Sequence, residues 1–254
     1  MYIKNIMSQK VELFGIKFDK LTIEEVKQFV EDFIKSGQKG YIVTPNAYHV
    51  VLLKKDNEFR QVYNHATLVL ADGIPIVWVS KILMYGLKRI TGSDILYCLC
   101  NLAAEKGFKV YFLGSKDIVV KKVIEKLQNV FPYLKIVGFH HGYFEDDKPV
   151  IDEINSVQPE ILFVGMGCPK QEKWVYNYLS HLNIKIAVLV GGVFEVIAGT
   201  KKRAPRWIQN IGLEWFWRLI QEPKRLWKRY LIGNTIFIFL VIEELIKKFL
   251  RRNK

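Results

Sequence analysis

Asp72 is the residue of this sequence whose position most clearly suggests chemistry. It ends an apolar run, Thr67-Leu-Val-Leu-Ala71, and is followed by Gly73 and, two residues on, Pro75. The pattern predicts a buried strand that turns into a helix, with Asp72 at the carboxyl edge of a sheet, where open α/β folds bind ligands. A carboxylate held there by rigid backbone is a candidate general base. An Asp in this place also caps a helix well, so the pattern alone leaves both roles open.

Three more predicted strand ends carry polar groups or bare backbone. Thr44-Pro-Asn46 ends one strand, Gly165-Met-Gly-Cys-Pro-Lys-Gln171 a second, and Gly191-Gly-Val-Phe-Glu195 a third. Glycine turns and helix N-termini bind phosphate through free N–H groups and the helix dipole, so a nucleotide or another diphosphate is a candidate ligand. The residues after Gly165-Met-Gly167 depart from the dinucleotide fingerprint, and each glycine taken singly also suits an ordinary tight turn.

These turns depend on a repeating order of strands and helices. Apolar segments typical of buried strands alternate with segments of helical spacing, which indicates a parallel sheet covered on both faces. The predicted strands are 41–44, 67–71, 109–114, 134–139, 161–165 and 184–190, and the predicted helices are 47–64, 74–83, 93–107, 116–130, 149–157 and 169–181. We therefore predict an α/β fold over residues 1–200, a Rossmann-like, doubly wound, mostly parallel sheet with helices on both faces.

The N-terminal part adds two smaller elements to this prediction. Residues 11–18 alternate between apolar and polar like a half-buried strand or hairpin. Thr22-Ile-Glu-Glu25 is a capping box that predicts a helix to about Gly37. The first ten residues contain no apolar run long enough for the core of a secretory signal, so we expect a cytoplasmic protein.

The basic residues are concentrated at the C-terminal end. Residues 201–254 contain 14 of the 38 Lys and Arg but only 4 of the 25 Asp and Glu, a net charge of +10, which leaves +3 for residues 1–200. A cationic segment attracts anionic lipid, nucleic acid or a phosphorylated substrate. The cysteines, Cys98, Cys100 and Cys168, have no zinc-like spacing with His and are expected to be reduced core thiols.

Residues 201–254 also carry the pattern of a helix at a membrane surface. Helices are predicted from Pro205 and again from Pro223, with aromatic side chains interleaved with Arg and Lys. The most apolar segment, 231–242, would extend about 18 Å as a helix, short of the roughly 30 Å hydrocarbon core. We therefore predict a C-terminal helical membrane-binding appendage that lies on an anionic membrane surface. Docking of the same apolar residues on the core or in a dimer seam is the alternative.

Seven short motifs, taken in order, resemble those of the WecG/TagA/CpsF glycosyltransferases. They are Thr44-Pro-Asn46, Ala71-Asp-Gly73, Arg89-Ile-Thr-Gly92, Gly167-Cys-Pro-Lys-Gln-Glu-Lys-Trp174, Gly191-Gly-Val-Phe194, Arg203-Ala-Pro-Arg-Trp207 and Glu214-Trp-Phe-Trp-Arg-Leu219. The resemblance implies an inverting, metal-independent enzyme without a cofactor. Such enzymes transfer an N-acetylmannosamine-type sugar from a UDP donor to polyprenyl-diphosphate-linked N-acetylglucosamine on the cytoplasmic side of the membrane. In the TagA branch, which this chain resembles most, the product is the linkage unit of wall teichoic acid.

The resemblance also implies roles for individual residues. Asp72 corresponds to the general base, and Thr44 and Asn46 lie beside it around the transferred sugar or the acceptor. Gln171 and Lys170 are placed on the nucleotide side. The expected substrate site is completed by Arg89, Gly191 and Gly192.

The diphosphate that leaves with the nucleotide needs positive charge. The sequence has no Asp-x-Asp triplet of the kind that holds a metal ion in other glycosyltransferases, so Arg, Lys or helix N-termini must offset this charge. The appendage supplies Arg203, Arg206, Arg218, Arg225 and Arg229. Glu195 stands where the family pattern favours Asp, and we assign it no role.

Other functions stay open at this stage. A related enzyme would use UDP-N-acetylmannosaminuronic acid or another UDP-hexose for a different surface polysaccharide. A nucleotide-cofactor oxidoreductase would use the same sheet, although Thr44-Pro-Asn46 stands where its glycine fingerprint is expected. A non-enzymatic lipid- or nucleic-acid-binding protein is favoured only by the basic aromatic appendage. Our first choice is a glycosyltransferase, peripheral on the inner face of the plasma membrane, that binds no nucleic acid; the sequence does not decide whether it is a homo-oligomer.

Overall fold

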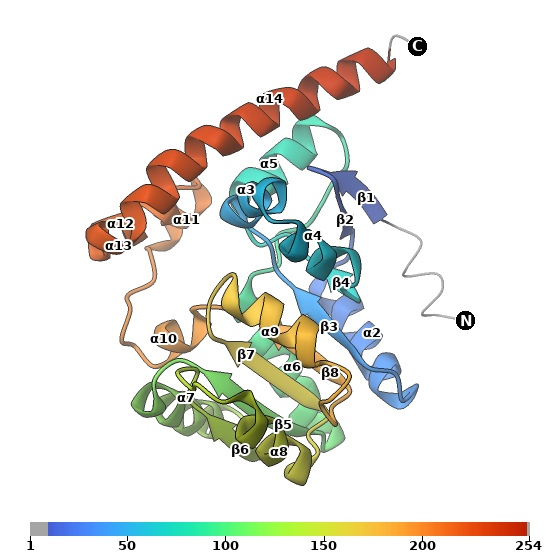
Figure 1. Ribbon diagram of the computed structural model, residues 1–254, viewed down its shortest axis with the longest axis vertical. Coiled ribbons are helices and arrows are strands. Elements are labelled where there is room, and N and C mark those ends of the chain that lie inside the picture. Colours follow the sequence, from blue (N-terminus) through green and yellow to red (C-terminus); the bar gives the residue numbers. More distant parts are fainter. Residues whose placement is uncertain (1–9, 253–254) are drawn as a thin grey trace.

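A six-stranded parallel sheet forms the centre of the protein. The computed structural model describes residues 10–252, without the side chains of Arg206, Asn210, Arg251 and Arg252. The strand order is β4-β3-β8-β7-β5-β6, and all neighbouring strands are parallel (Figure 1). The strands are β3 (Gly40–Val43), β4 (Leu68–Val69), β5 (Lys109–Gly114), β6 (Lys135–His140), β7 (Ile161–Gly165) and β8 (Ile186–Leu189). The predicted Rossmann-like sheet is confirmed, with every strand within a few residues of its expected place.

Each face of the sheet carries a hydrophobic cluster. Successive side chains of a strand point to opposite faces, so one strand contributes to both clusters. Along β7, Leu162 and Val164 enter one hydrophobic cluster, whereas Ile161 and Phe163 enter another on the opposite face. Helices α3, α4, α5, α8 and α9 contribute to the first cluster, and α2, α6, α7 and α10 to the second. Strands that are apolar throughout therefore mark a sheet with helices on both sides, as predicted.

The helices of the core follow the predicted segments, with one division. They are α2 (Ile23–Lys35), α3 (Ala47–Lys55), α4 (Asn57–Asn64), α5 (Ile74–Ile82), α6 (Gly92–Lys106), α7 (Asp117–Val130), α8 (Asp147–Val157), α9 (Lys170–Tyr178) and α10 (Val193–Ile197). The single helix expected over 47–64 is wrong. Asp56 leaves the helical conformation there and accepts a hydrogen bond from the Phe59 N–H, which caps a new helix, α4.

A short hairpin covers the edge of the sheet beside β4. Strands β1 (Lys10–Leu13) and β2 (Ile16–Asp19) pair antiparallel, as the alternating pattern predicts. The buried Asp19 carboxylate accepts a hydrogen bond of 2.8 Å from the Val69 N–H of β4. The Asp19 side chain thus provides a hydrogen-bond partner for a backbone N–H of β4, the edge strand that leads to Asp72.

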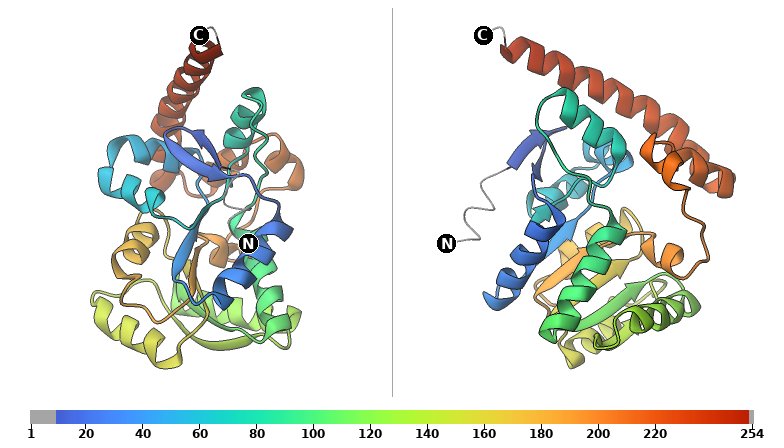
Figure 2. Two further views of the ribbon diagram at one scale, coloured as in Figure 1. Left: turned by 90° about the vertical axis from the view of Figure 1, so that its right-hand side faces the viewer. Right: turned by 180° about the vertical axis from the view of Figure 1, so that it is seen from behind.

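The C-terminal appendage consists of short helices followed by one long helix. They are α11 (Arg206–Asn210), α12 (Glu214–Gln221), α13 (Pro223–Trp227), the π-helical turn η1 (Lys228–Ile232) and α14 (Gly233–Arg252). The helix expected from Pro205 divides at Gly212, which adopts a left-handed φ of 72°. Figure 2 shows α14 as a rod across one end of the core. It packs against α3, and Phe237 meets Phe14 of the hairpin with ring centroids 5.4 Å apart.

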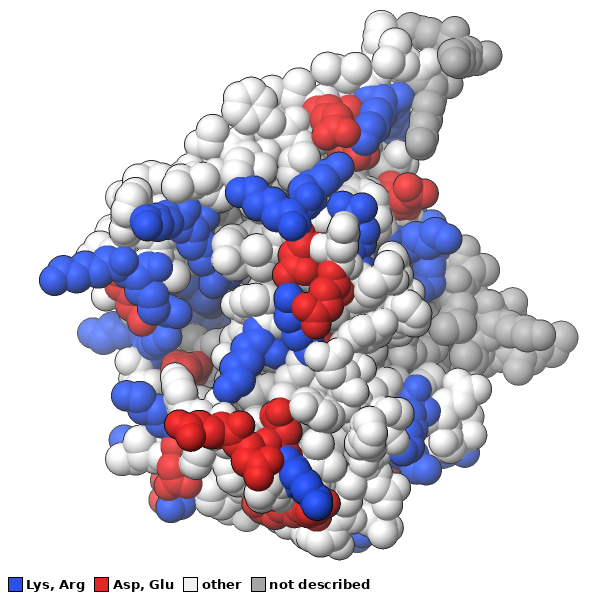
Figure 3. All heavy atoms as spheres, viewed as in Figure 1, with Lys and Arg blue, Asp and Glu red and all other residues white. Residues whose placement is uncertain are grey.

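The appendage separates charge from apolar surface. No helix within residues 10–252 combines the length and apolar character that crossing a membrane requires. Along α14 the exposed side chains include Ile238, Phe239, Ile242, Ile246, Phe249 and Leu250. Figure 3 shows this edge largely without charge, whereas Lys and Arg gather below it near α12 and α13. The appendage therefore presents an apolar stripe beside a basic surface.

Candidate active site

Two adjoining cavities open at the carboxyl edge of the sheet. The larger, about 760 Å³, is bounded by the turns after β3, β5, β7 and β8 and by part of the appendage. The smaller, about 370 Å³, lies between α5 and the appendage. Five residues line both cavities: Asn46, Asp72, Arg218, Arg229 and Tyr230. The predicted strand ends therefore do meet at one crevice, and Asp72 lies where its two parts join.

Backbone contacts hold Asp72 at this junction. Its N–H donates to the Pro45 carbonyl at 3.1 Å, and its carbonyl accepts from Arg89 Nε at 3.0 Å. Gly73 suits the close approach of the two turns, since a Cβ there would make a tight contact of 3.3 Å with Asn46 Cα. Among the described residues, no hydrogen bond or ion pair joins the Asp72 carboxylate to another side chain. The backbone of Asp72 is therefore held in place, and its carboxylate is free to accept a proton.

The surroundings of Asp72 raise its pKa to about 7. Burial is the main cause, because it disfavours the charged form, and the negative charge of Glu214 adds to it. Arg89 and Arg218 act in the opposite direction, and Asp94 raises the pKa further. A carboxyl group whose pKa lies near neutral pH is a better general base than an ordinary aspartate, which is too weakly basic.

Glu214 links the core to the appendage beside Asp72. Its two carboxylate oxygens each lie 3.2 Å from a guanidinium nitrogen, one of Arg89 in the core and one of Arg218 in α12. The predicted substrate residue Arg89 and the predicted diphosphate residue Arg218 thus share one acidic partner. Sequence reasoning placed Glu214 in a motif but gave it no role.

Thr44 and Asn46 lie beside Asp72 as expected, and both also serve the backbone. The Thr44 hydroxyl donates to the Leu189 carbonyl at 3.3 Å and lines the larger cavity. Asn46 caps α3, with its side-chain oxygen accepting from the Tyr48 N–H at 3.0 Å. Because each residue keeps part of its surface in a cavity, the capping role and the predicted contact with a sugar are compatible.

Gln171 is buried and ties two glycine turns together. Its side-chain oxygen accepts from the N–H groups of Gly167 and Gly191, at 3.2 and 3.1 Å, and its amide nitrogen donates to Glu172 at 2.9 Å. These bonds occupy both ends of the side chain. The predicted contact with the nucleotide stays a prediction, and the contacts in hand show Gln171 shaping the turns that line the larger cavity.

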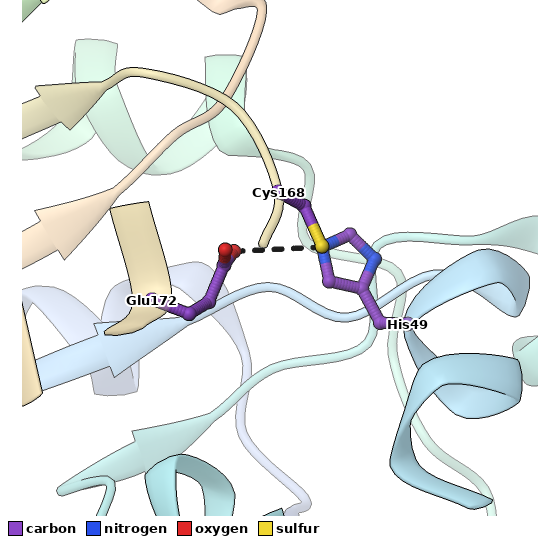
Figure 4. Close-up of side chains that lie close together, drawn as sticks. All are labelled: His49, Cys168 and Glu172. Carbon is purple, nitrogen blue, oxygen red and sulfur yellow. Dashed lines mark ion pairs between the residues drawn. The ribbon is translucent and has the colours of Figure 1, made fainter. Parts of the chain in front are cut away.

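A buried group that the sequence did not reveal lies behind these turns. His49 Nε2 is 3.5 Å from a Glu172 oxygen, and the Cys168 sulfur lies beside both, all ligating atoms being within 4.8 Å of one another (Figure 4). His49 Nδ1 accepts a hydrogen bond from the Asn46 N–H at 3.2 Å. That bond requires a bare Nδ1 and hence a proton on Nε2, which points to Glu172.

This tautomer does not suit a metal ion. A neutral histidine that ligates through Nε2 carries its proton on Nδ1, where it would face the Asn46 N–H. The group is better described as a polar cluster between the turns after β3, β7 and β8. His49 accepts from Asn46 and lies 3.5 Å from Glu172, and Gln171 binds Glu172 and Gly191. The spacing of these residues in the sequence gave no sign of it, because only the fold brings α3 and α9 together.

The appendage brings arginines to both cavities. The Arg229 guanidinium lies 4.1 Å from the centre of the Tyr48 ring, and its Nε is buried without a hydrogen-bond partner. Arg203 and Arg225 line the larger cavity, and Arg225 is paired with Glu222. The predicted contribution of Arg206 lies outside the described side chains. Arg218 and Arg229 are therefore the two appendage arginines that line both cavities, with Arg218 paired with Glu214 and Arg229 stacked on Tyr48.

The remaining predicted residues lie along the larger cavity. Lys170 donates to the Gly142 carbonyl at 2.9 Å and stacks on Phe144. Gly191 and Gly192 open the turn after β8. Glu195, to which the sequence gave no role, accepts from the Ser115 hydroxyl at 2.9 Å, and its second oxygen is buried without a partner.

Comparison with known proteins shows the family of this chain. The profile of the glycosyl transferase WecG/TagA/CpsF family matches residues 11–251. The chain belongs to this family. It is a glycosyltransferase, and the resemblance seen in the motifs is confirmed.

Two relatives have been given the same enzymatic name, N-acetylglucosaminyldiphosphoundecaprenol N-acetyl-beta-D-mannosaminyltransferase. The protein of Bacillus subtilis (strain 168) is 35% identical over 195 residues, 76% of each chain. That of Staphylococcus aureus (strain MW2) is 32% identical over 221 residues, 85% of this chain and 87% of the relative. Both alignments therefore cover about three quarters or more of each protein.

Proposed function

We propose that this glycosyltransferase transfers N-acetylmannosamine from UDP-N-acetylmannosamine to polyprenyl-diphosphate-linked N-acetylglucosamine, with inversion, at the cytoplasmic face of the membrane. The reaction would form the linkage unit of wall teichoic acid. The names of the relatives support the sugar and the acceptor. The observation that carries the mechanism is the position of Asp72, a carboxylate without a side-chain partner at the junction of two cavities.

Two cavities that meet at one base suit a single displacement. The donor would occupy the larger cavity and the acceptor the smaller. The acceptor hydroxyl oxygen attacks the anomeric carbon while the bond from that carbon to the diphosphate oxygen breaks, and UDP leaves with the bonding electrons. Asp72 takes the hydroxyl proton and later releases it to solvent. Attack from the face opposite the leaving group inverts the anomeric centre.

Protein cations can meet the charge of the departing UDP. Arg229, Arg225 and Arg203 line the larger cavity together with the glycine turns after β7 and β8. Fixed cations and free N–H groups placed where negative charge develops are the usual means of stabilising such a leaving group. This arrangement supports the prediction that transfer does not require a metal ion.

The appendage accounts for the lipid-linked acceptor. The exposed residues Ile238, Ile242, Ile246 and Leu250 are spaced by four, so they form one stripe along α14. A helix with such a stripe, flanked by Lys and Arg, binds at the surface of an anionic membrane. Phe237 and Ile238 also line the smaller cavity, which connects the stripe to Asp72. We propose that residues 201–254 act as a membrane-binding part that completes the site of the core.

Release of UDP tests the proposed reaction directly. The wild-type protein would be mixed with anionic vesicles, UDP-N-acetylmannosamine and a prenyl-diphosphate N-acetylglucosamine. Divalent metal would be left out. We expect UDP release that depends on both substrates and a disaccharide product. Equal turnover with another UDP-hexose would overturn the assigned donor, and equal turnover by Asp72→Asn would overturn the assigned base.

A further inference from the structure

Arg89 and Arg218 both act on the charge of Asp72, yet within the part of the chain that the structure describes neither forms an ion pair with its carboxylate. Arg89 Nη2 and Arg218 Nη2 both bind the Glu214 carboxylate, each at 3.2 Å. Arg89 also donates through Nε to the backbone carbonyl of Asp72 rather than to its side chain. All four residues line the smaller cavity. Glu214 therefore binds two arginines, whereas the neighbouring Asp72 carboxylate has no ion pair among the described residues.

This arrangement is unusual because an aspartate next to two arginines ordinarily forms an ion pair with them. An opposite charge within a few ångströms favours the ionised carboxylate and lowers its pKa by about 1–3 units. A carboxylate so paired is a weaker base and is less able to accept a proton. Something must therefore keep Arg89 and Arg218 from Asp72 if Asp72 is the base.

Glu214 is the group on the described elements that does this. The charged groups around Asp72 are Arg89 in the loop before α6, Asp94 in α6, Glu214 and Arg218 in α12, and Arg229 in η1. Asp94 is occupied by the N–H and hydroxyl of Thr91, at 2.9 and 2.7 Å. Arg229 is stacked on Tyr48. Only Glu214 contacts both arginines that would otherwise reach Asp72.

We propose that Glu214 is a positioning residue, which holds Arg89 and Arg218 away from the Asp72 carboxylate and so leaves Asp72 free to act as the base. This inference rests on the proposed function and adds a role to it. Its structural consequence concerns the appendage. Glu214 is the first residue of α12, so it lies away from Asp72 when the appendage is not docked on the core. Arg89 is then free to pair with the Asp72 carboxylate. The enzyme would carry its active base only when the appendage is in place.

The test compares Glu214→Gln with a matched control, Glu243→Gln. Glu243 is also an appendage glutamate in ion pairs, with Lys54 and Lys247, but it lies outside both cavities. The pKa of Asp72 would be measured in full-length protein by carbon NMR of labelled aspartate, with Asp72→Asn identifying the signal. We expect the pKa to fall by about one unit or more in Glu214→Gln and to stay unchanged in Glu243→Gln.

Activity gives the second readout. In Glu214→Gln the acid limb of the kcat profile should move to lower pH by a similar amount, and kcat at pH 8 should fall about tenfold. Glu214→Asp should recover part of kcat, since it keeps the charge. Removing a competing cation in the double variant Glu214→Gln/Arg218→Gln should return the pKa of Asp72 toward its wild-type value.

Other results would overturn the role. If Glu214→Gln lost vesicle binding or raised the acceptor KM while the pKa of Asp72 stayed at its wild-type value, Glu214 would only hold the appendage in place. If the double variant kept the lowered pKa, the arginines would not be the cause. Wild-type protein that released no UDP would reject the proposed function, whereas the NMR comparison would still decide whether Glu214 controls Asp72.

Discussion

The two cavities that meet at Asp72 are built in different ways. The larger one is bounded mainly by turns of the core, whose polar groups are satisfied within the protein: Gln171 binds Gly167 and Gly191, and His49 binds Asn46. The smaller one is closed by the appendage, whose Arg218 shares the acid Glu214 with Arg89 of the core. The larger cavity is thus shaped mainly by the core, with appendage residues such as Arg203 and Arg225 in its lining, whereas the smaller cavity is closed by the appendage.

This difference suits the two substrates. A soluble nucleotide sugar would meet a pocket whose turns come from the core and whose cations Arg203, Arg225 and Arg229 come from the appendage. A lipid-linked acceptor is present only at a membrane, where the apolar stripe of α14 would lie. A cavity completed by the same appendage would therefore bring the base, the cations and the lipid together at one place. Substitutions can separate the roles of the two cavities, beginning with Asp72, which lines both.

Asp72→Asn should have the largest effect, because it removes the base at the junction without changing the size of the side chain. We expect kcat for UDP release to fall about 10³-fold, within the range of general base catalysis. In the wild type, kcat should rise with pH through about 7, since the pKa of Asp72 is raised to that value and only the ionised form accepts a proton.

Binding measurements distinguish this loss from misfolding. UDP affinity by calorimetry and retention on anionic vesicles should both stay unchanged in Asp72→Asn, since the two cavities remain intact. Asp152→Asn is the matched control, because Asp152 is exposed on α8 and lines neither cavity. A wild-type kcat that is flat between pH 6 and 8 would contradict the role of Asp72.

Arg229→Ala should have the next largest effect, and on both sides at once. Arg229 lines both cavities, is held by Tyr48 and offers a buried Nε without a partner. Loss of a preorganised donor at a leaving group reduces kcat by about 10²–10³-fold. We expect a loss of about 10²-fold in kcat and a weaker affinity for UDP. Lys248→Ala, which removes an appendage cation stacked on Tyr85, should keep wild-type kcat.

The sequence predicted the core side better than the appendage side. The strands and most helices were found because buried parallel strands are apolar throughout and because capping boxes such as Thr22–Glu25 mark helix starts. The break at Asp56 was missed, since the apolar spacing continues across it and only the capping bond reveals it. The strand-end turns could be predicted to meet, because a parallel sheet gathers the carboxyl ends of its strands at one edge.

The contacts between distant segments could not be predicted. Nothing in the spacing of His49 and Glu172 indicates that α3 and α9 bring them within 3.5 Å. Likewise, the local sequence around Glu214 shows an ordinary acid with an Arg four residues later, a pair common on helix surfaces. Its second partner, Arg89, is 125 residues away, and only the docking of α12 reveals it.

Removing the apolar stripe should affect the acceptor side alone. Phe239 and Ile246 are 67% and 54% exposed, so the double variant Phe239→Gln/Ile246→Gln disturbs no core contact. Each buried apolar side chain contributes about 1.5–3 kcal/mol, and partial insertion of two of them predicts about 10- to 100-fold weaker binding to anionic vesicles by sedimentation. Activity on a lipid acceptor in vesicles should fall in parallel.

Two controls test whether the stripe is specific. With a short-chain acceptor in solution, Phe239→Gln/Ile246→Gln should turn over like the wild type. Tyr133→Gln removes an aromatic ring that is 84% exposed outside the appendage and should leave vesicle binding unchanged. If the stripe variant bound vesicles normally but changed its oligomeric state in sedimentation velocity, α14 would form a dimer seam instead of a membrane contact.

The smallest effect is expected on the donor side, from His49. His49→Ala removes the acceptor of the Asn46 N–H, which then loses its hydrogen-bond partner, and it removes the 3.5 Å contact to Glu172, which keeps its hydrogen bond from Gln171. An unsatisfied buried group costs about 1–3 kcal/mol, which predicts a lower Tm. We expect the donor KM to rise about fivefold while the acceptor KM and vesicle binding stay at wild-type values.

His49→Gln separates positioning from general stability. Glutamine at this place in a capping box can accept the Asn46 N–H, but it cannot reach Glu172 at the same time. It should therefore restore most of the donor KM while Tm stays below that of the wild type, because the contact of position 49 with the buried Glu172 carboxylate is still lost. If His49→Ala instead raised the acceptor KM, the Asn46 turn would transmit changes across Asp72. The two cavities would then behave as one coupled site rather than as two independent ones.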